Sequence, residues 1–200
     1  MTYAMKILID NGHGIDTPGK RSPDGFFREY AYTRFLASKI QERLLALNLD
    51  ARLLVPELED ISLKERCRRV IAICKEFGND RVILISLHVN AAGNGREWLN
   101  ARGWSCYTTR GQTAADSLAN CLYEAAKVRL PDMRLRTDYT DGDPDIESNF
   151  YILRHTSCPA VLTENLFMDN QEDVAFLESD EGAQAIVNLH VDGILQYINI

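Results

Sequence analysis

The chain has 200 residues, 46% of them hydrophobic, which suffices for one well-buried core. Its 22 Lys and Arg against 29 Asp and Glu give a formal charge of −7, which would repel a phosphate backbone and argues against nucleic-acid binding. No apolar run is long enough to span a bilayer, and no linker, repeat or low-complexity tract divides the chain. We therefore expect one domain over residues 1–200, without membrane insertion.

Strand and helix signals alternate along the chain, which is typical of an α/β layer fold. We expect strands over residues 5–10, 51–55, 82–87, 103–108, 150–154 and 160–163. We expect helices over residues 28–47, 62–78 and 179–197 and one opening at Thr113, with Ser62, Thr113 and Ser179 at their N-termini. The polar segment 131–148 is expected to be a long loop that flanks the site. Short, uninterrupted apolar runs favour strands buried on both faces of a mostly parallel sheet.

The first helix carries a carboxylate on its inward stripe. Glu29 lies one turn before Tyr32, and a buried carboxylate costs several kcal/mol unless it is paired. A metal ion would supply that partner. The stripe that we expect to face the core comprises Tyr32, Phe35, Leu36, Ile40, Leu44 and Leu47.

Three further polar groups follow apolar strands. His13 comes after the strand at 5–10, His88 after 82–87 and Glu164 after 160–163. Parallel sheets bind ligands beyond the carboxyl ends of their strands, so these groups and Glu29 can meet at one edge. Two His and one Glu make a three-ligand zinc set with an open fourth position.

Other candidates favour ordinary structural roles. We expect His190 to be a packed, hydrogen-bonded core histidine, and we leave open whether His155 lines the site. The basic clusters Lys20–Arg21 and Arg66–Arg68–Arg69 are expected to be solvated faces. The acidic run from Asp138 to Glu147 does not match the EF-hand spacing and is expected to be a solvated loop. No serine-nucleophile elbow, phosphate-binding loop or dinucleotide fingerprint is present.

Cysteine usage favours a reducing compartment. The five cysteines are an odd number with no Cys-x-x-Cys pair, so they do not resemble a disulfide framework. We expect Cys67 and Cys74 to be core residues on one helical stripe. The N-terminus lacks the basic start and long apolar core of a secretory signal, so we expect synthesis and folding in the cytoplasm.

Four sequence blocks resemble the type 3 family of zinc-dependent N-acetylmuramoyl-L-alanine amidases, which includes bacterial autolysins and phage endolysins. They are Ile9–Gly14, Glu29 opening a helix, Ile85–Ala91 and Pro159–Asn165, in the family's order. One departure is Leu54–Asp60, where the family usually carries a Thr-Arg pair and then an acidic residue.

The resemblance implies a twisted, mostly parallel sheet sandwiched between helices. It implies that His13, Glu29 and His88 are zinc ligands and that Glu164 is the catalytic carboxylate. The substrate would be peptidoglycan, cut between the lactyl group of N-acetylmuramic acid and the L-alanine of the stem peptide. The chain would be a catalytic domain with no separate wall-binding domain, acting on the wall after release, as prophage-type lysins do.

Two alternatives stay open at this point. A zinc exopeptidase-like hydrolase of small peptides would share every feature derived from spacing alone. A non-catalytic cell-wall-binding or nucleotide-binding α/β module would have no need of an open metal site.

Overall fold

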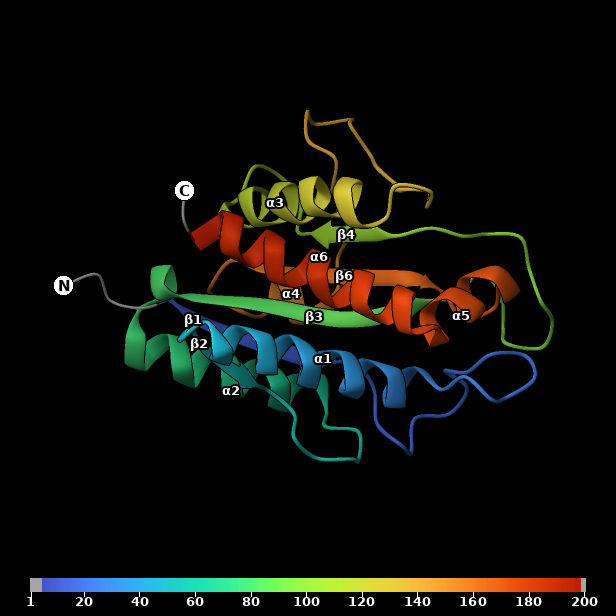
Figure 1. The fold of residues 1–200 in the computed structure, drawn as a ribbon. Helices are drawn as coiled ribbons and strands as arrows, with labels where there is room; N and C mark the ends of the chain where they lie inside the picture. The colour runs from blue at the N-terminus through green and yellow to red at the C-terminus, as the bar shows by residue number, and fades with distance from the viewer. Residues whose placement is uncertain (1–4, 199–200) are drawn as a thin grey trace.

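The computed structural model describes residues 5–198, and within them six strands form one sheet in the order β2-β1-β3-β6-β4-β5 (Figure 1). The strands are β1 (Lys6–Asn11), β2 (Asp50–Leu53), β3 (Val82–Asn90), β4 (Ser105–Thr108), β5 (Ile146–Glu147) and β6 (Ala160–Phe167). The helices are α1 (Glu29–Ala46), α2 (Leu63–Phe77), α3 (Ala114–Arg129), α4 (Tyr151–Arg154), α5 (Gln171–Glu178) and α6 (Asp180–Ile198), with a short 3-10 helix η1 (Asn79–Arg81).

The sheet is mostly parallel, as the apolar runs predict. Strands β2, β1, β3 and β6 are parallel neighbours, whereas β4 pairs antiparallel with β6 and β5 pairs parallel with β4. Alternate side chains of β1 enter opposite cores, because successive residues of a strand point to opposite faces. Ile7 and Ile9 pack in one core with α1, α3 and α6, whereas Leu8 packs in the other with α2 and α4. The α/β sandwich of a sheet between helices is thereby confirmed.

The predicted helix starts are confirmed by their caps. The Ser62 hydroxyl accepts the Glu65 N–H at 3.3 Å, and the Ser179 hydroxyl accepts the Gly182 N–H at 3.0 Å. Thr113 and Asp116 cap α3 reciprocally. No helix within residues 5–198 combines the length and apolar character needed to cross a membrane.

Five secondary-structure expectations need correction, one of them the loop expected over residues 131–148, which contains the short strand β5. Residues 151–154 form the one-turn helix α4 rather than a strand, and Ile152 and Leu153 bury their side chains against the α2 side of the sheet. An apolar run this short does not distinguish strand from helix. Strand β6 continues to Phe167, so Glu164 lies inside a strand, and β3 continues to Asn90 with a register shift after His88. Helix α5, capped by the Asn170 side chain, was not expected.

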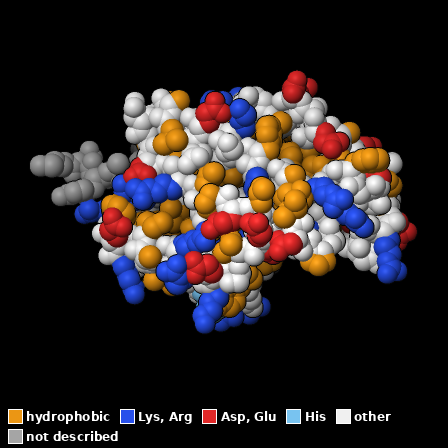
Figure 2. All heavy atoms as spheres, turned by 90° about the horizontal axis from the view of Figure 1, so that it is seen from below, with side chains coloured by type: hydrophobic (Ala, Val, Ile, Leu, Met, Phe, Trp, Pro, Cys, Tyr) orange, Lys and Arg blue, Asp and Glu red, His pale blue; other side chains and the backbone are white. Residues whose placement is uncertain are grey.

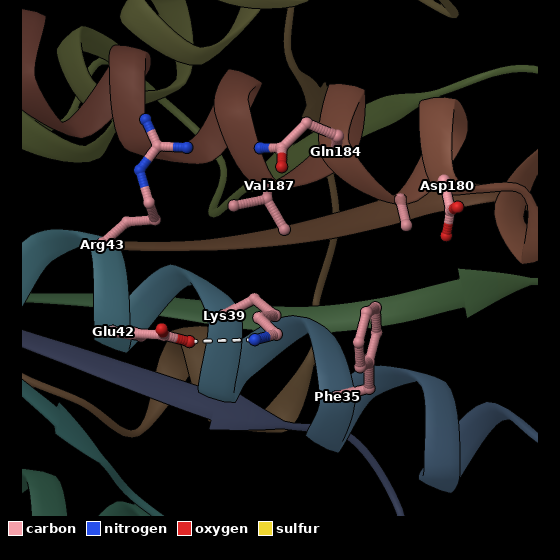
Figure 3. Close-up of a pocket in the computed structure, with 8 residues that line it drawn as sticks. Phe35, Lys39, Glu42, Arg43, Asp180, Gln184 and Val187 are labelled. Carbon is pink, nitrogen blue, oxygen red and sulfur yellow. Dashed lines mark hydrogen bonds and ion pairs between the residues drawn. The ribbon is translucent and has the colours of Figure 1, made fainter.

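The inward stripe of α1 is narrower than expected. Tyr32, Leu36, Ile40 and Leu44 are buried at a spacing of four residues, but Phe35 is 46% and Leu47 49% exposed. Phe35 instead borders a shallow groove between α1 and α6 (Figure 3). The groove is also lined by the Lys39–Glu42 ion pair, Arg43, Asp180, Gln184 and Val187.

The basic cluster on α2 divides into exposed and buried members. Arg68 pairs with Glu65 and is mostly exposed, and Arg69 bridges Glu65 and Glu57. Seen from below, acidic and basic side chains are interspersed over the molecule (Figure 2). Arg66 is only 2% exposed, so its assignment to a solvated face is wrong. Cys67 and Cys74 are buried as expected.

Candidate metal and catalytic site

His13 lies just past the end of β1, in a loop whose backbone packs closely against neighbouring segments. Its φ of 62° is in the left-handed region, which costs free energy for a residue with a Cβ. A Cβ at Gly12 would lie 2.4 Å from the His88 ring, and one at Gly14 would lie 2.0 Å from the Asp60 nitrogen. The two glycines therefore make room for the second histidine and for the loop before α2.

Glu29 is the first residue of α1 and is 1% exposed. Its Oε1 accepts the Val89 N–H at 3.0 Å and lies 3.1 Å from His88 Nδ1. Its Oε2 lies 3.5 Å from His13 Nε2 and has no hydrogen-bond partner among the described residues. A buried carboxylate oxygen without a donor is expected where a cation binds.

The three side chains fit a metal ion. One ligand atom each from His13, Glu29 and His88 all lie within 4.8 Å of one another, and within residues 5–198 they form the one such group of three or more. In a tetrahedral zinc site with bonds of about 2.0–2.1 Å, neighbouring ligand atoms are separated by about 3.3 Å. His88 Nδ1 lies 3.1 Å from Glu29 Oε1 and His13 Nε2 lies 3.5 Å from Glu29 Oε2, so each imidazole is near that distance from one of the two carboxylate oxygens.

The electrostatics favour the protonation state that a metal ligand needs at His13 and Glu29, but they oppose it at His88. Burial is the largest influence on His13 and lowers its pKa to about 4, so the imidazole is neutral at pH 7. Burial opposes ionisation of Glu29, but its hydrogen bond and charge interaction with His88 outweigh this and lower its pKa. The pKa of His88 is raised because Glu29 outweighs the effect of burial. A metal that binds here would displace the His88 proton when that group is charged.

Glu164 lies on β6, the strand next to β3, which carries His88. Parallel pairing of β3 and β6 sets Glu164 directly opposite His88. Burial raises the pKa of Glu164 to about 7, and its Oε2 has no hydrogen-bond partner among the described residues. A carboxyl group with a pKa near neutrality is suited to accept and return a proton.

A cavity of about 440 Å³ joins these groups. His13, His88 and Glu164 form part of its polar lining. Its apolar wall includes Ile61, Phe150, Tyr151, Ile152 and Leu162. Helix α4, expected as a strand, thus contributes to the wall of the site.

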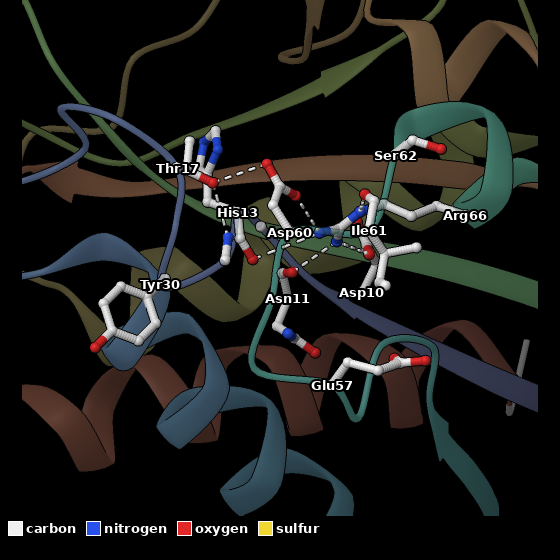
Figure 4. Close-up of polar contacts among 12 residues, drawn as sticks. Asp10, Asn11, His13, Thr17, Tyr30, Glu57, Asp60, Ile61, Ser62 and Arg66 are labelled. Atoms are coloured by element: carbon white, nitrogen blue, oxygen red, sulfur yellow. Dashed lines mark hydrogen bonds and ion pairs between the residues drawn. The ribbon is translucent and has the colours of Figure 1, made fainter.

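Beneath His13, a buried arginine ties three segments together (Figure 4). Arg66 donates to Asp10 Oδ1 at 2.6 Å and to Asp60 Oδ1 at 3.0 Å. It also donates to the carbonyl oxygens of Asn11 at 2.7 Å, Ile61 at 2.7 Å and His13 at 3.4 Å. Sequence reasoning missed this role, although the helical spacing of positions 66, 70 and 74 already placed Arg66 on the buried face of α2.

The remaining histidines lie away from the cavity lining. His190 is fully buried, with Nε2 3.0 Å from the Thr163 hydroxyl and Nδ1 2.8 Å from the Ile186 carbonyl oxygen, as predicted for a core histidine. His155 is exposed and stacks on Tyr151 with ring centroids 3.9 Å apart. The open question about His155 is thereby answered, since it does not line this cavity.

The acidic loop is only partly solvated. Asp143 is 8% and Asp145 2% exposed, so the expectation of a solvated loop is wrong for these two. Asp145 accepts a hydrogen bond from the Thr108 hydroxyl, and Asp143 accepts one from Gln112 at 3.2 Å. Burial is the main cause that raises the pKa of Asp145 to about 7.

Comparisons with known proteins agree with the geometry. The chain is 29% identical over 198 residues to N-acetylmuramoyl-L-alanine amidase CwlM of Bacillus licheniformis, covering 98% of this chain and 70% of that relative. It is 29% identical over 121 residues to an endolysin of Bacillus phage SPP1, covering 59% of this chain and 41% of that relative.

Solved structures show the same fold. The catalytic domain of CwlV, an N-acetylmuramoyl-L-alanine amidase from Bacillus (Paenibacillus) polymyxa var. colistinus, superposes with a TM-score of 0.79 at 22% identity, covering 98% of this chain and 99% of that one. An N-acetylmuramoyl-L-alanine amidase from Clostridium difficile 630 gives 0.77 at 23% identity, covering 98% and 97%. The family model described as N-acetylmuramoyl-L-alanine amidase matches residues 7–196. Because that match takes in nearly the whole chain, the chain belongs to the N-acetylmuramoyl-L-alanine amidase family.

Proposed function

We propose that this amidase is zinc-dependent, with His13, Glu29 and His88 as metal ligands and Glu164 as the proton-transfer group. The bond cut is the amide between the lactyl group of N-acetylmuramic acid and the L-alanine of the stem peptide. The observation that carries the proposal is the gathering of two His and one Glu within 4.8 Å, next to a carboxyl group with a raised pKa.

Each residue has a distinct task in the reaction. Zinc, when bound, would act as a Lewis acid that polarises the amide carbonyl and lowers the pKa of a water molecule. Glu164 accepts a proton from the attacking water as the new C–O bond forms, and it donates a proton to the amide nitrogen as the C–N bond breaks. Three protein ligands are the usual number at a catalytic zinc, which leaves Glu164 free for this transfer.

The surrounding residues hold the reacting groups in place. Arg34 Nη1 donates to the His13 carbonyl oxygen at 2.9 Å, and Asn165 Nδ2 donates to the His88 carbonyl oxygen at 3.0 Å. Asn165 is itself fixed, because its Oδ1 accepts the Trp104 indole N–H at 3.0 Å. These contacts fix the backbone segments from which the two imidazoles project.

Digestion of purified peptidoglycan tests the bond assignment. We expect free stem peptides that begin with L-alanine and glycan strands with unsubstituted lactyl groups, identified by mass spectrometry. Glu164→Gln, measured beside the wild type, controls for contaminating hydrolases. Cleavage inside the stem peptide would favour the exopeptidase-like alternative, and binding without cleavage would favour the non-catalytic module.

The same digestion tests whether this domain is sufficient for catalysis and whether it acts on the cell wall. We propose that the described domain is sufficient for catalysis and that it acts on the cell wall. The match to a phage endolysin supports action on the cell wall. Failure of the purified chain to release stem peptides from intact wall material, with cleavage of soluble fragments retained, would show that wall binding needs a further component.

A further inference from the structure

Lys20 is a cation without a partner at the edge of the catalytic cavity. Two basic side chains line this cavity, Lys20 and Arg66. Arg66 is occupied by Asp10 and Asp60, at 2.6 and 3.0 Å. The Lys20 ammonium has no ion pair or hydrogen bond with any residue in the part of the chain that the structure describes, 5–198. It is therefore available to a ligand.

The backbone of Lys20 is tied to the proposed metal site. Its carbonyl oxygen accepts the Glu29 N–H at 3.0 Å, and the next residue, Arg21, forms a β-bridge with Arg28. Lys20 has a φ of 40°, in the left-handed region, so the loop is held in a conformation that is unfavourable for a residue with a side chain. The side chain thus starts from a point fixed by the first turn of α1.

The cavity also contains acidic groups that disfavour an anionic substrate. Asp60 and Glu164 line it, and Glu29 lies behind the two histidines. Apart from the proposed metal, Lys20 is, among the residues that the structure describes, the cation at this cavity that is not already paired and can bind a carboxylate.

We propose that Lys20 determines substrate specificity by binding a free carboxylate on the stem-peptide residue that follows L-alanine. The inference rests on the proposed function. One residue of extended chain spans at most about 3.3–3.6 Å, so a carboxylate on the second residue lies within roughly 7 Å of the scissile nitrogen. In peptidoglycan this residue bears either an α-carboxylate or an α-carboxamide, and Lys20 distinguishes the two by charge.

Two synthetic muramoyl peptides that differ only in this group test the proposal. The wild type should cleave the carboxylate peptide with a kcat/KM roughly tenfold above that for the carboxamide, the size expected for one charge-assisted hydrogen bond in a partly open cavity. Lys20→Met should remove this preference by slowing the carboxylate peptide alone, mainly through KM. Lys20→Arg should keep it. Arg21→Met, an exposed neighbour on the same loop, is the matched control.

Binding gives a readout that does not depend on turnover. We would measure binding of both peptides by calorimetry to zinc-loaded Glu164→Gln and to the double variant that also carries Lys20→Met. The single variant should bind the carboxylate peptide more tightly than the carboxamide peptide, and the double variant should bind the two equally. An equal decrease for both peptides in Lys20→Met would assign Lys20 a structural role and overturn the proposal, as would an unchanged preference. If the wild type cleaves neither peptide, the proposed function itself fails, which is distinct from cleavage of both at equal rates.

Discussion

Replacing Arg66 by Met tests whether the buried arginine supports the site. Met has a similar length and no charge, so the substitution leaves little cavity but removes all five hydrogen bonds that Arg66 donates. Among the described residues 5–198, the Asp10 carboxylate, 1% exposed, then keeps only the Ser86 hydroxyl at 2.6 Å as a donor. A buried charge is left without its counter-charge.

The burial of the Arg66–Asp10 ion pair sets the expected decrease in the free energy of unfolding. Breaking a buried ion pair by removing one partner typically costs about 3–5 kcal/mol, because the remaining charge is uncompensated. Arg68→Met on the same helix removes only an exposed pair with Glu65, which water screens and which contributes little to stability. We therefore expect the free energy of unfolding to fall by about 3–5 kcal/mol in Arg66→Met and by much less in Arg68→Met.

Urea unfolding of both variants, followed by circular dichroism at fixed zinc concentration, measures the difference. The double variant Asp10→Asn with Arg66→Met should recover part of the loss, because the unpaired carboxylate is gone. Arg66→Met should also bind zinc more weakly, since Arg66 and Arg34 both donate to the His13 carbonyl oxygen. A loss in Arg66→Met no larger than that in Arg68→Met would refute the reasoning.

Three further predictions concern the site and the thiols. His88→Ala should lower the zinc content of the purified protein, which we expect to be close to one ion per chain in the wild type, and unchanged content by atomic absorption would exclude the proposed ligand set. Glu164→Gln should retain zinc and fold but lose turnover by about 10²- to 10⁴-fold, and loss of zinc would make Glu164 a ligand. All five cysteines are buried and free, so thiol titration without reductant should find five per chain after unfolding and few before it, whereas a native disulfide would lower the first number.

The site was predictable where it depended on local pattern. Each proposed metal ligand follows a short apolar strand or opens an amphipathic helix, and the rule that ligands bind beyond the carboxyl ends of parallel strands brings them together. The structure places His13, Glu29 and His88 in one cluster, as expected. Glu164 lies inside β6, and it reaches the site because β3 and β6 pair in that register, which no local pattern encodes.

The parts that were missed depend on contacts between distant segments. Arg66 has charged neighbours on α2, which indicate a solvated surface, and its burial is explained by partners in other segments, such as Asp10, 56 residues earlier, and Asp60. The apolar residues of segment 151–154 would suit a strand or a helix equally well. In the structure the segment is a helix that packs on the α2 side of the sheet. In both cases tertiary packing outweighs the local signal.

The buried acidic loop leads to a last prediction, on pH. The folded-state pKa of Asp145 is raised to about 7 from an ordinary value of 3.8, with burial as the largest cause and Asp143 adding to it. The folded protein therefore holds this proton more tightly than the unfolded chain does. The stabilisation is complete below pH 3.8 and is lost as the pH rises through about 7.

Asp145→Asn is neutral at every pH and escapes this loss. Relative to the wild type, its free energy of unfolding should increase by about 2 kcal/mol between pH 5 and pH 8, since each pH unit over which one proton is released contributes about 1.4 kcal/mol. Asp132→Asn, an exposed substitution on the same loop, controls for the loss of one charge. Urea unfolding at the two pH values measures both variants. A difference between Asp145→Asn and the wild type that is the same at pH 5 and pH 8 would mean that Asp145 is ionised in the folded protein throughout, and that the Thr108 hydroxyl compensates for its burial.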